Sequence, residues 1–76
     1  MNTEEYLEGK RKAEIAYYHI IQTGLIPDFN NGRSESDRNI RWGLDNGVFT
    51  PEDLDIAKGT YEERERFFRA DIDRTK

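Results

Sequence analysis

The chain has 76 residues, no cysteine and a net charge of −4, with 34% hydrophobic and 37% charged residues. A chain this short forms at most one domain with a thin core, and the lack of cysteine excludes disulfides and removes the usual zinc ligands. We therefore expect a single domain over residues 1–76 whose stability depends on association with a larger protein or with a second copy.

The N-terminal sequence "MNTEEYLEG" has neither the basic start nor the apolar centre of a signal peptide. No apolar run approaches the ~18 residues that span a membrane. We expect a cytoplasmic protein with no membrane contact.

The first predicted helix begins at Asn2, which with Glu5 forms a capping box, and ends at Gly24. If Gly24 is the residue after the helix, Ile20 and Leu25 hold the positions that touch in a Schellman motif. One face carries a core stripe at helical spacing: Tyr6, Ala13, Tyr17, Ile20 and Ile21. Leu7, Ile15 and Tyr18 lie off that stripe, which predicts a helix that packs on two sides.

A connector follows, in which Pro27 disfavours helix and the apolar residues Leu25, Ile26 and Phe29 should tuck against the core. The second predicted helix begins after Ser34 or Ser36 and ends at "DNG", residues 45–47. Its Ile40 and Leu44 lie one turn apart, and Asp37 can pair with Arg41. Trp42 points about 160° away from Ile40 and Leu44, so this helix has two apolar faces. One of these faces must contact something other than the helix's own core partner.

The third predicted helix has the clearest start in the chain. Thr50 is the N-cap, Pro51 takes the first helical position, and Phe49 with Leu54 fits a hydrophobic staple. A core stripe then runs straight across Gly59 and predicts one helix to about Asp73; it consists of Leu54, Ala57, Tyr61, Phe68 and Ile72. The alternative is a kink or division at Gly59, with Thr60 and Glu63 capping a fresh helix.

No segment shows the sustained alternation of a strand. The predicted fold is therefore all-α, a small three-helix domain with a long, a short and a long helix.

Several chemistries lack the residues they need. The loop "DFNNGRSESD" fits the spacing of an EF-hand in no frame, and no glycine-rich phosphate loop follows a strand. His19, the single histidine, lies in an apolar helix and is expected to be a half-buried or interface imidazole rather than a catalytic residue. We expect no catalytic residue, no metal site, no cofactor and no enzymatic activity.

The second and third predicted helices could form a helix-turn-helix, but the charge argues against DNA reading. The end that would meet the bases carries Glu52, Asp53 and Asp55, which phosphate would repel. Residues 1–26, 27–50 and 51–76 have net charges of −1, −1 and −2, so no third of the chain is basic. We do not expect a nucleic-acid partner.

Apolar residues off the core stripes are the candidate binding residues. On a continuous third helix, Ile56 and Phe67 project together, about 120° from the core stripe. They flank a face that carries Glu52, Asp55, Glu62, Glu63 and Asp73. Tyr18 and Trp42 join the candidates because aromatic residues are enriched at interfaces. The alternative is that the first helix and the connector cover some of them.

These features favour a noncatalytic protein-binding module that acts as an inhibitor, adaptor or small regulator of a larger protein, or forms a homo-oligomer. One alternative is an acidic mimic of nucleic acid, and another is an oligomeric small-ligand binder that uses Lys10, Arg11 or Lys12 with a tyrosine. In size, acidity and lack of cysteine the chain resembles the accessory proteins with which phages and mobile elements disable host defences, which would imply an inhibitor.

Overall fold

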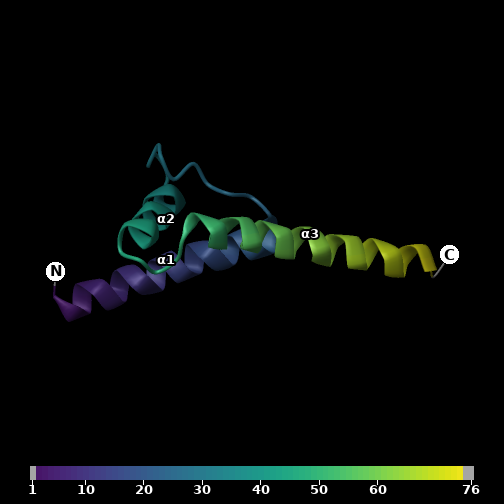
Figure 1. Cartoon of the computed structure of the whole chain (residues 1–76), viewed down its shortest axis with the longest axis horizontal. Coiled ribbons are helices and arrows are strands. Elements are labelled where there is room, and N and C mark those ends of the chain that lie inside the picture. Colours follow the sequence, from purple (N-terminus) through teal and green to yellow (C-terminus); the bar gives the residue numbers. More distant parts are fainter. Residues whose placement is uncertain (1, 75–76) are drawn as a thin grey trace.

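The structure is a computed structural model that describes the backbone of residues 2–74 and the side chains of residues 2–69. It contains three α-helices: α1, Thr3–Thr23; α2, Glu35–Asp45; and α3, Pro51–Arg74 (Figure 1). Between residues 2 and 74 there is no strand. The predicted all-α fold of a long, a short and a long helix is confirmed.

Both ends of α1 lie where the sequence places them. The Asn2 side chain accepts a 2.8 Å hydrogen bond from the Glu5 amide, and Gly24 ends the helix with φ 70°. The Gly24 amide donates to the Ile20 carbonyl at 2.7 Å, which is the αL ending rather than the Schellman motif. Leu25 is exposed, so the predicted Leu25–Ile20 contact is wrong, and of the connector's apolar residues Ile26 and Phe29 pack on the core.

Ser34, rather than Ser36, caps α2. Its hydroxyl accepts from the Asp37 amide at 3.0 Å, while the Asp37 carboxylate accepts from the Ser34 amide at 3.3 Å. Because Asp37 is buried in this capping box, Arg41 pairs instead with Asp45, at 3.3 Å. The predicted Asp37–Arg41 pair is therefore replaced by an ion pair one turn further along.

The third helix is continuous through Gly59, so the prediction of one undivided helix is confirmed. Thr50 caps it as predicted, with its hydroxyl accepting from the Asp53 amide at 3.3 Å and the Asp53 carboxylate accepting from the Thr50 amide at 2.9 Å. The Thr60 hydroxyl donates to the Ile56 carbonyl at 2.9 Å instead of capping a new helix.

The first and third helices lie side by side and run in the same direction, whereas α2 crosses the N-terminal part of α1 (Figure 1). The register of α1 on α3 is fixed by Tyr17, whose hydroxyl donates to the Asp53 carbonyl at 3.0 Å, and by Gly24, which lies against the Tyr61 ring. Glycines allow the closest approaches elsewhere: a Cβ at Gly9 would overlap Trp42, and one at Gly43 would overlap Phe49.

The core is thin and lies between the projecting start of α1 and the projecting end of α3 (Figure 1). Its buried apolar residues form one cluster: Ala13, Ala16, Ile20, Ile40, Phe49, Leu54 and Ala57. The chain measures 56 × 24 × 19 Å, and its radius of gyration of 15.1 Å exceeds the value of about 11 Å for a compact chain of this length. The extra length comes from the C-terminal half of α3 and, at the other end, from the first turns of α1, which both extend beyond the core (Figure 1).

Candidate functional site

The C-terminal half of α3 has no helix beside it. α1 ends at Thr23, and the contact of Gly24 with Tyr61 is level with the middle of α3. Beyond Tyr61 the helix continues for 13 residues to Arg74, which is about 20 Å of helix. We call residues 62–74 the α3 arm. All of its described side chains, residues 62–69, are exposed.

Two adjacent phenylalanines lie on the α3 arm. Phe67 is 72% exposed and Phe68 is 68% exposed. Phe67 is a predicted binding residue, and it lies in the open as that prediction requires. Phe68 continues the stripe of Leu54, Ala57 and Tyr61, so its predicted place in the core is wrong; the stripe is apolar, but α1 is too short to reach it. The predicted stripe residue Ile72 and the acidic-face residue Asp73 lie outside the described side chains.

Ile56 faces the same side of α3 as Phe67 and is 61% exposed. The two residues are eleven positions apart, so about 16 Å of helix separates them. The immediate neighbours of Ile56 line a shallow depression of α3 with it: Gly59, Thr60, Glu62, Glu63 and Arg66. A partner that covers both apolar residues must therefore lie along three turns of the helix.

The four predicted acidic residues, Glu52, Asp55, Glu62 and Glu63, are all exposed along α3. Basic residues interrupt this acidic face. Arg66 shares the depression with Ile56 and Glu63, and Arg69 pairs with Glu65 at 3.2 Å. The electrostatic character of the arm is therefore mixed.

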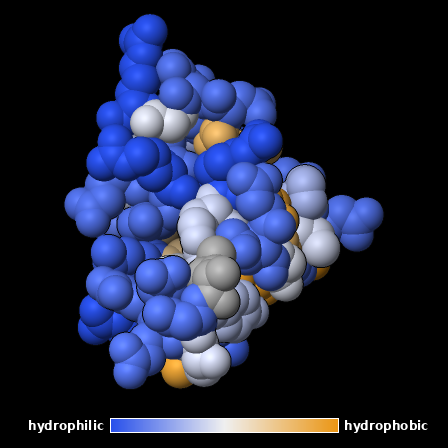
Figure 2. Space-filling view, turned by 90° about the vertical axis from the view of Figure 1, so that its left-hand side faces the viewer, coloured by the Kyte–Doolittle hydropathy of each residue, from blue (hydrophilic) through white to orange (hydrophobic). Residues whose placement is uncertain are grey.

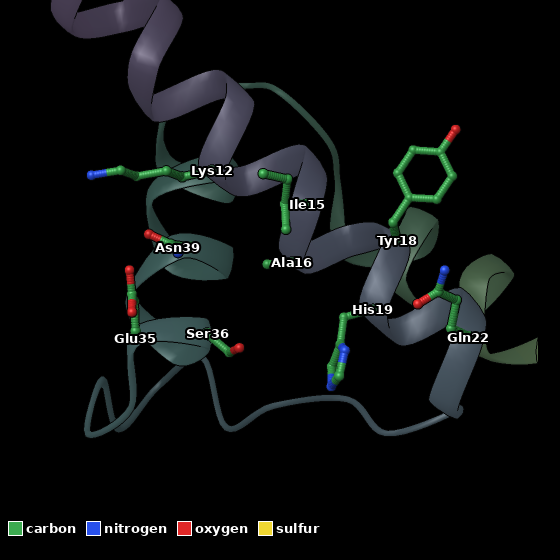
Figure 3. A pocket seen from close by; sticks show the side chains of 9 residues that line it. All are labelled: Lys12, Ile15, Ala16, Tyr18, His19, Gln22, Glu35, Ser36 and Asn39. Atoms are coloured by element: carbon green, nitrogen blue, oxygen red, sulfur yellow. The ribbon is translucent and has the colours of Figure 1, made fainter.

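Tyr18 and Trp42 lie on other parts of the surface. Tyr18, on α1, is 63% exposed and borders an open groove of about 580 Å³ between α1 and α2, in which Figure 3 shows its ring pointing away from α2. Trp42 is half-buried, because its ring packs on Tyr6 with 5.7 Å between ring centroids and lies against Gly9. The apolar candidates are thus spread over three helices and do not form one site.

The groove beside Tyr18 is lined by apolar, polar and charged side chains. It is lined by Lys12, Ile15, Ala16, Tyr18, His19, Gln22, Glu35, Ser36 and Asn39 (Figure 3). His19 is exposed in it, so the expected half-burial of this imidazole is wrong, whereas an interface role for it stays a prediction. Lys12 pairs with Glu8 at 3.4 Å.

Tyr17 is the residue whose titration the fold alters. Burial raises the pKa of its phenol above the ordinary value of 10.0, and the negative charge of Asp53 raises it further. The neutral hydroxyl donates to the Asp53 backbone carbonyl, and the ring packs on Phe49 with 5.4 Å between centroids. The role of Tyr17 is therefore to hold α1 against the start of α3.

The hydropathy of the surface is low over the face shown in Figure 2, where apolar side chains appear as separate spots among hydrophilic ones. Within the described part of the chain, no helix is both long enough and apolar enough to cross a membrane. Nor do three His, Asp or Glu side chains among the described residues gather closely enough to hold a metal ion.

Comparison with known proteins gives no relative: no protein-family model, curated protein or solved structure matches the chain. The candidate sites therefore rest on the chain's own geometry. Sequence patterns missed the exposure of Phe68 and Leu25. The signal for Phe68 was the stop at Gly24, because a first helix that ends there leaves the last part of a longer parallel neighbour uncovered.

Proposed function

We propose that the chain is a noncatalytic protein-binding module that attaches to a larger protein through the α3 arm, as an inhibitor, adaptor or small regulator. The observation that carries this proposal is the pair Phe67 and Phe68, both exposed on a segment that extends past the core. Exposed aromatic residues with a charged surround are typical of interaction sites.

The total surface supports the same proposal. The chain exposes 5918 Å², whereas a compact monomer of 9.0 kDa exposes about 4,900 Å². The excess of about 1,000 Å² is comparable to the roughly 800 Å² that each partner buries in an interface of standard size. Compared with a compact chain, the protein therefore exposes additional surface of about the area that one partner buries in a standard interface.

The shape of the arm fits a groove on the partner. A helix that inserts its apolar side into a groove is a recurring mode of peptide recognition. Phe67 and Phe68 project about 100° apart around the helix, so the groove must cover a broad side of it. Burying each ring is worth about 1.5–3 kcal/mol, which is enough to make either residue a hot spot.

An acidic mimic of nucleic acid remains the second candidate, and the exposed acids Glu52, Asp55, Glu62 and Glu63 favour it. Arg66 and the Glu65–Arg69 pair weaken the negative field at the arm. The two functions differ in their response to salt, because electrostatic binding is screened whereas apolar burial is not.

The test compares three versions of the full chain: the natural sequence, Phe67→Glu and Arg66→Gln. Each substitution changes the net charge by −1, but Arg66 lies about 100° from Phe67 and about 160° from Phe68 around the helix, so it projects away from the side between the two rings. The protein captured by the natural chain from a lysate of the producing cells is identified, purified and titrated with each version by calorimetry.

We expect Phe67→Glu to weaken binding at least tenfold and Arg66→Gln to change it by less than about threefold, with the same helical circular dichroism for all three. Equal binding by all three versions would place the interface elsewhere. Loss of helix in Phe67→Glu would show that Phe67 supports the fold and would refute the exposed arm. A steep fall of affinity with salt would favour the acidic mimic.

A further inference from the structure

The outward side of α1 carries a second set of exposed apolar residues, separate from the α3 arm. Leu7, Ile15 and Tyr18 are each more than half exposed. The buried residues of α1, namely Ala13, Ala16 and Ile20, face α2 and α3 on the other side of the helix. The predicted packing of α1 on two sides is therefore wrong within the described chain: it touches two helices, but with one broad face.

The outward residues have the spacing of a helix-pairing seam. Leu7, Arg11, Glu14 and Tyr18 follow one another at intervals of four, three and four residues. At 100° per residue they lie within about 60° of each other around α1. This is the spacing of the seam along which two helices pack in a coiled coil.

The order of these residues is complementary to itself when reversed. If a second α1 lies antiparallel, with the two-fold axis between positions 12 and 13, Leu7 meets Tyr18 of the second copy and Arg11 meets its Glu14. By symmetry each contact occurs twice. A parallel pair would instead set Arg11 against Arg11 and Glu14 against Glu14, which like-charge repulsion disfavours.

The surroundings of Glu14 suit an incoming guanidinium. Glu14 and Asp53 line one shallow depression, together with Tyr17, Tyr18, Val48 and Phe49. The Glu14 side chain is 54% exposed, and the Lys10 amine that pairs with its carboxylate is 4.0 Å away. Arg11 of a second copy would therefore enter between two carboxylates with an aromatic ring beside them, where Arg binds well.

We infer that a second copy of this chain packs antiparallel on the outward side of α1, through Leu7 and Tyr18, with reciprocal Arg11–Glu14 ion pairs. The resulting two-fold dimer holds out two α3 arms, so it would bind a repeated or dimeric target with higher avidity than one arm gives. The dimer uses α1 and does not depend on the function proposed for the α3 arm.

The test is the mass in solution, measured by sedimentation equilibrium over a range of concentrations. The chains compared are the natural sequence, Arg11→Glu, Glu14→Arg, the double swap Arg11→Glu with Glu14→Arg, and Phe67→Glu as the control on the other surface. Circular dichroism of each chain checks that the exposed substitutions leave the helices intact.

We expect the natural chain to approach twice its 9.0 kDa mass at concentrations of about 0.1–0.5 mM, since contacts along one helix give weak dimers. Each single reversal should weaken dimerisation about tenfold or more, because it turns two attractions into repulsions. The double swap should restore it, and Phe67→Glu should dimerise like the natural chain. A natural chain that stays monomeric at about 0.5 mM, single reversals without effect, or a double swap no better than either single change would each overturn the dimer.

Discussion

Replacing Gly59 by alanine should stabilise the protein. Gly59 lies inside the continuous helix α3, eight residues after Pro51, and a Cβ added there meets no atom within 4 Å. Glycine in a helix interior costs about 1 kcal/mol relative to alanine, and alanine also narrows the unfolded ensemble. Because the new methyl group neither clashes nor fills a void, the whole difference in helix propensity between glycine and alanine should appear as an increase in the free energy of unfolding.

The magnitude can be measured by urea or thermal unfolding followed by circular dichroism. A gain of about 1 kcal/mol corresponds to a rise in Tm of roughly 4–8 °C for a domain of this size. Gly43→Ala is the matched control, since Gly43 is also helical but its added Cβ would lie 2.5 Å from Phe49 Cζ and 3.1 Å from Ala13 Cβ. Overpacking of this kind costs about 1–3 kcal/mol, so Gly43→Ala should destabilise the chain.

The pair of glycine variants tests both the continuity of α3 and the packing of α2. A loss of stability in Gly59→Ala would mean that the helix is bent or divided at this position, so that glycine is required there. Equal gains in both variants would mean that Phe49 does not lie over Gly43. Either result would mean that the surroundings of Gly59 or Gly43 in solution differ from those in the structure.

Two further substitutions have defined outcomes. Tyr17→Phe removes the hydrogen bond to the Asp53 carbonyl and should cost about 1 kcal/mol at neutral pH. The fold raises the pKa of Tyr17. The contribution of the neutral phenol to the free energy of unfolding is therefore complete below the pKa of the unfolded chain, about 10, and is lost as the pH rises through the pKa of the folded chain. Unfolding curves at alkaline pH should show this loss of stability in the natural chain but not in Tyr17→Phe. Ser34→Ala removes the cap of α2 and should cost about 1 kcal/mol in urea unfolding, whereas Ser36→Ala should cost less than about 0.5 kcal/mol; equal costs would contradict the assigned cap.

The local signals in the sequence were enough to predict most of the helix boundaries. Asn2, Ser34 and Thr50 each cap a helix with hydrogen bonds between neighbours in the chain. Such bonds depend on residues within one turn, so a pattern of three or four letters predicts them. The all-α fold follows from these ends and from the apolar stripes between them.

The exposure of individual apolar residues could not be predicted in the same way. Phe68 has the spacing of a core residue, yet it is exposed because α1 ends level with Tyr61, about two helical turns before Phe68. Trp42 looks like an interface residue by composition, yet Tyr6 and Gly9 cover part of its ring. Both outcomes depend on how helices distant in sequence are aligned, which periodicity within one helix does not determine.

The claim that the α3 arm is the binding surface is tested most directly by amide hydrogen exchange of the protein alone and bound to its purified partner. We expect the amides of residues 62–69 to exchange more slowly in the complex, while those of the already packed start of α3 change little. Unchanged exchange across residues 62–69 in a saturated complex would contradict it.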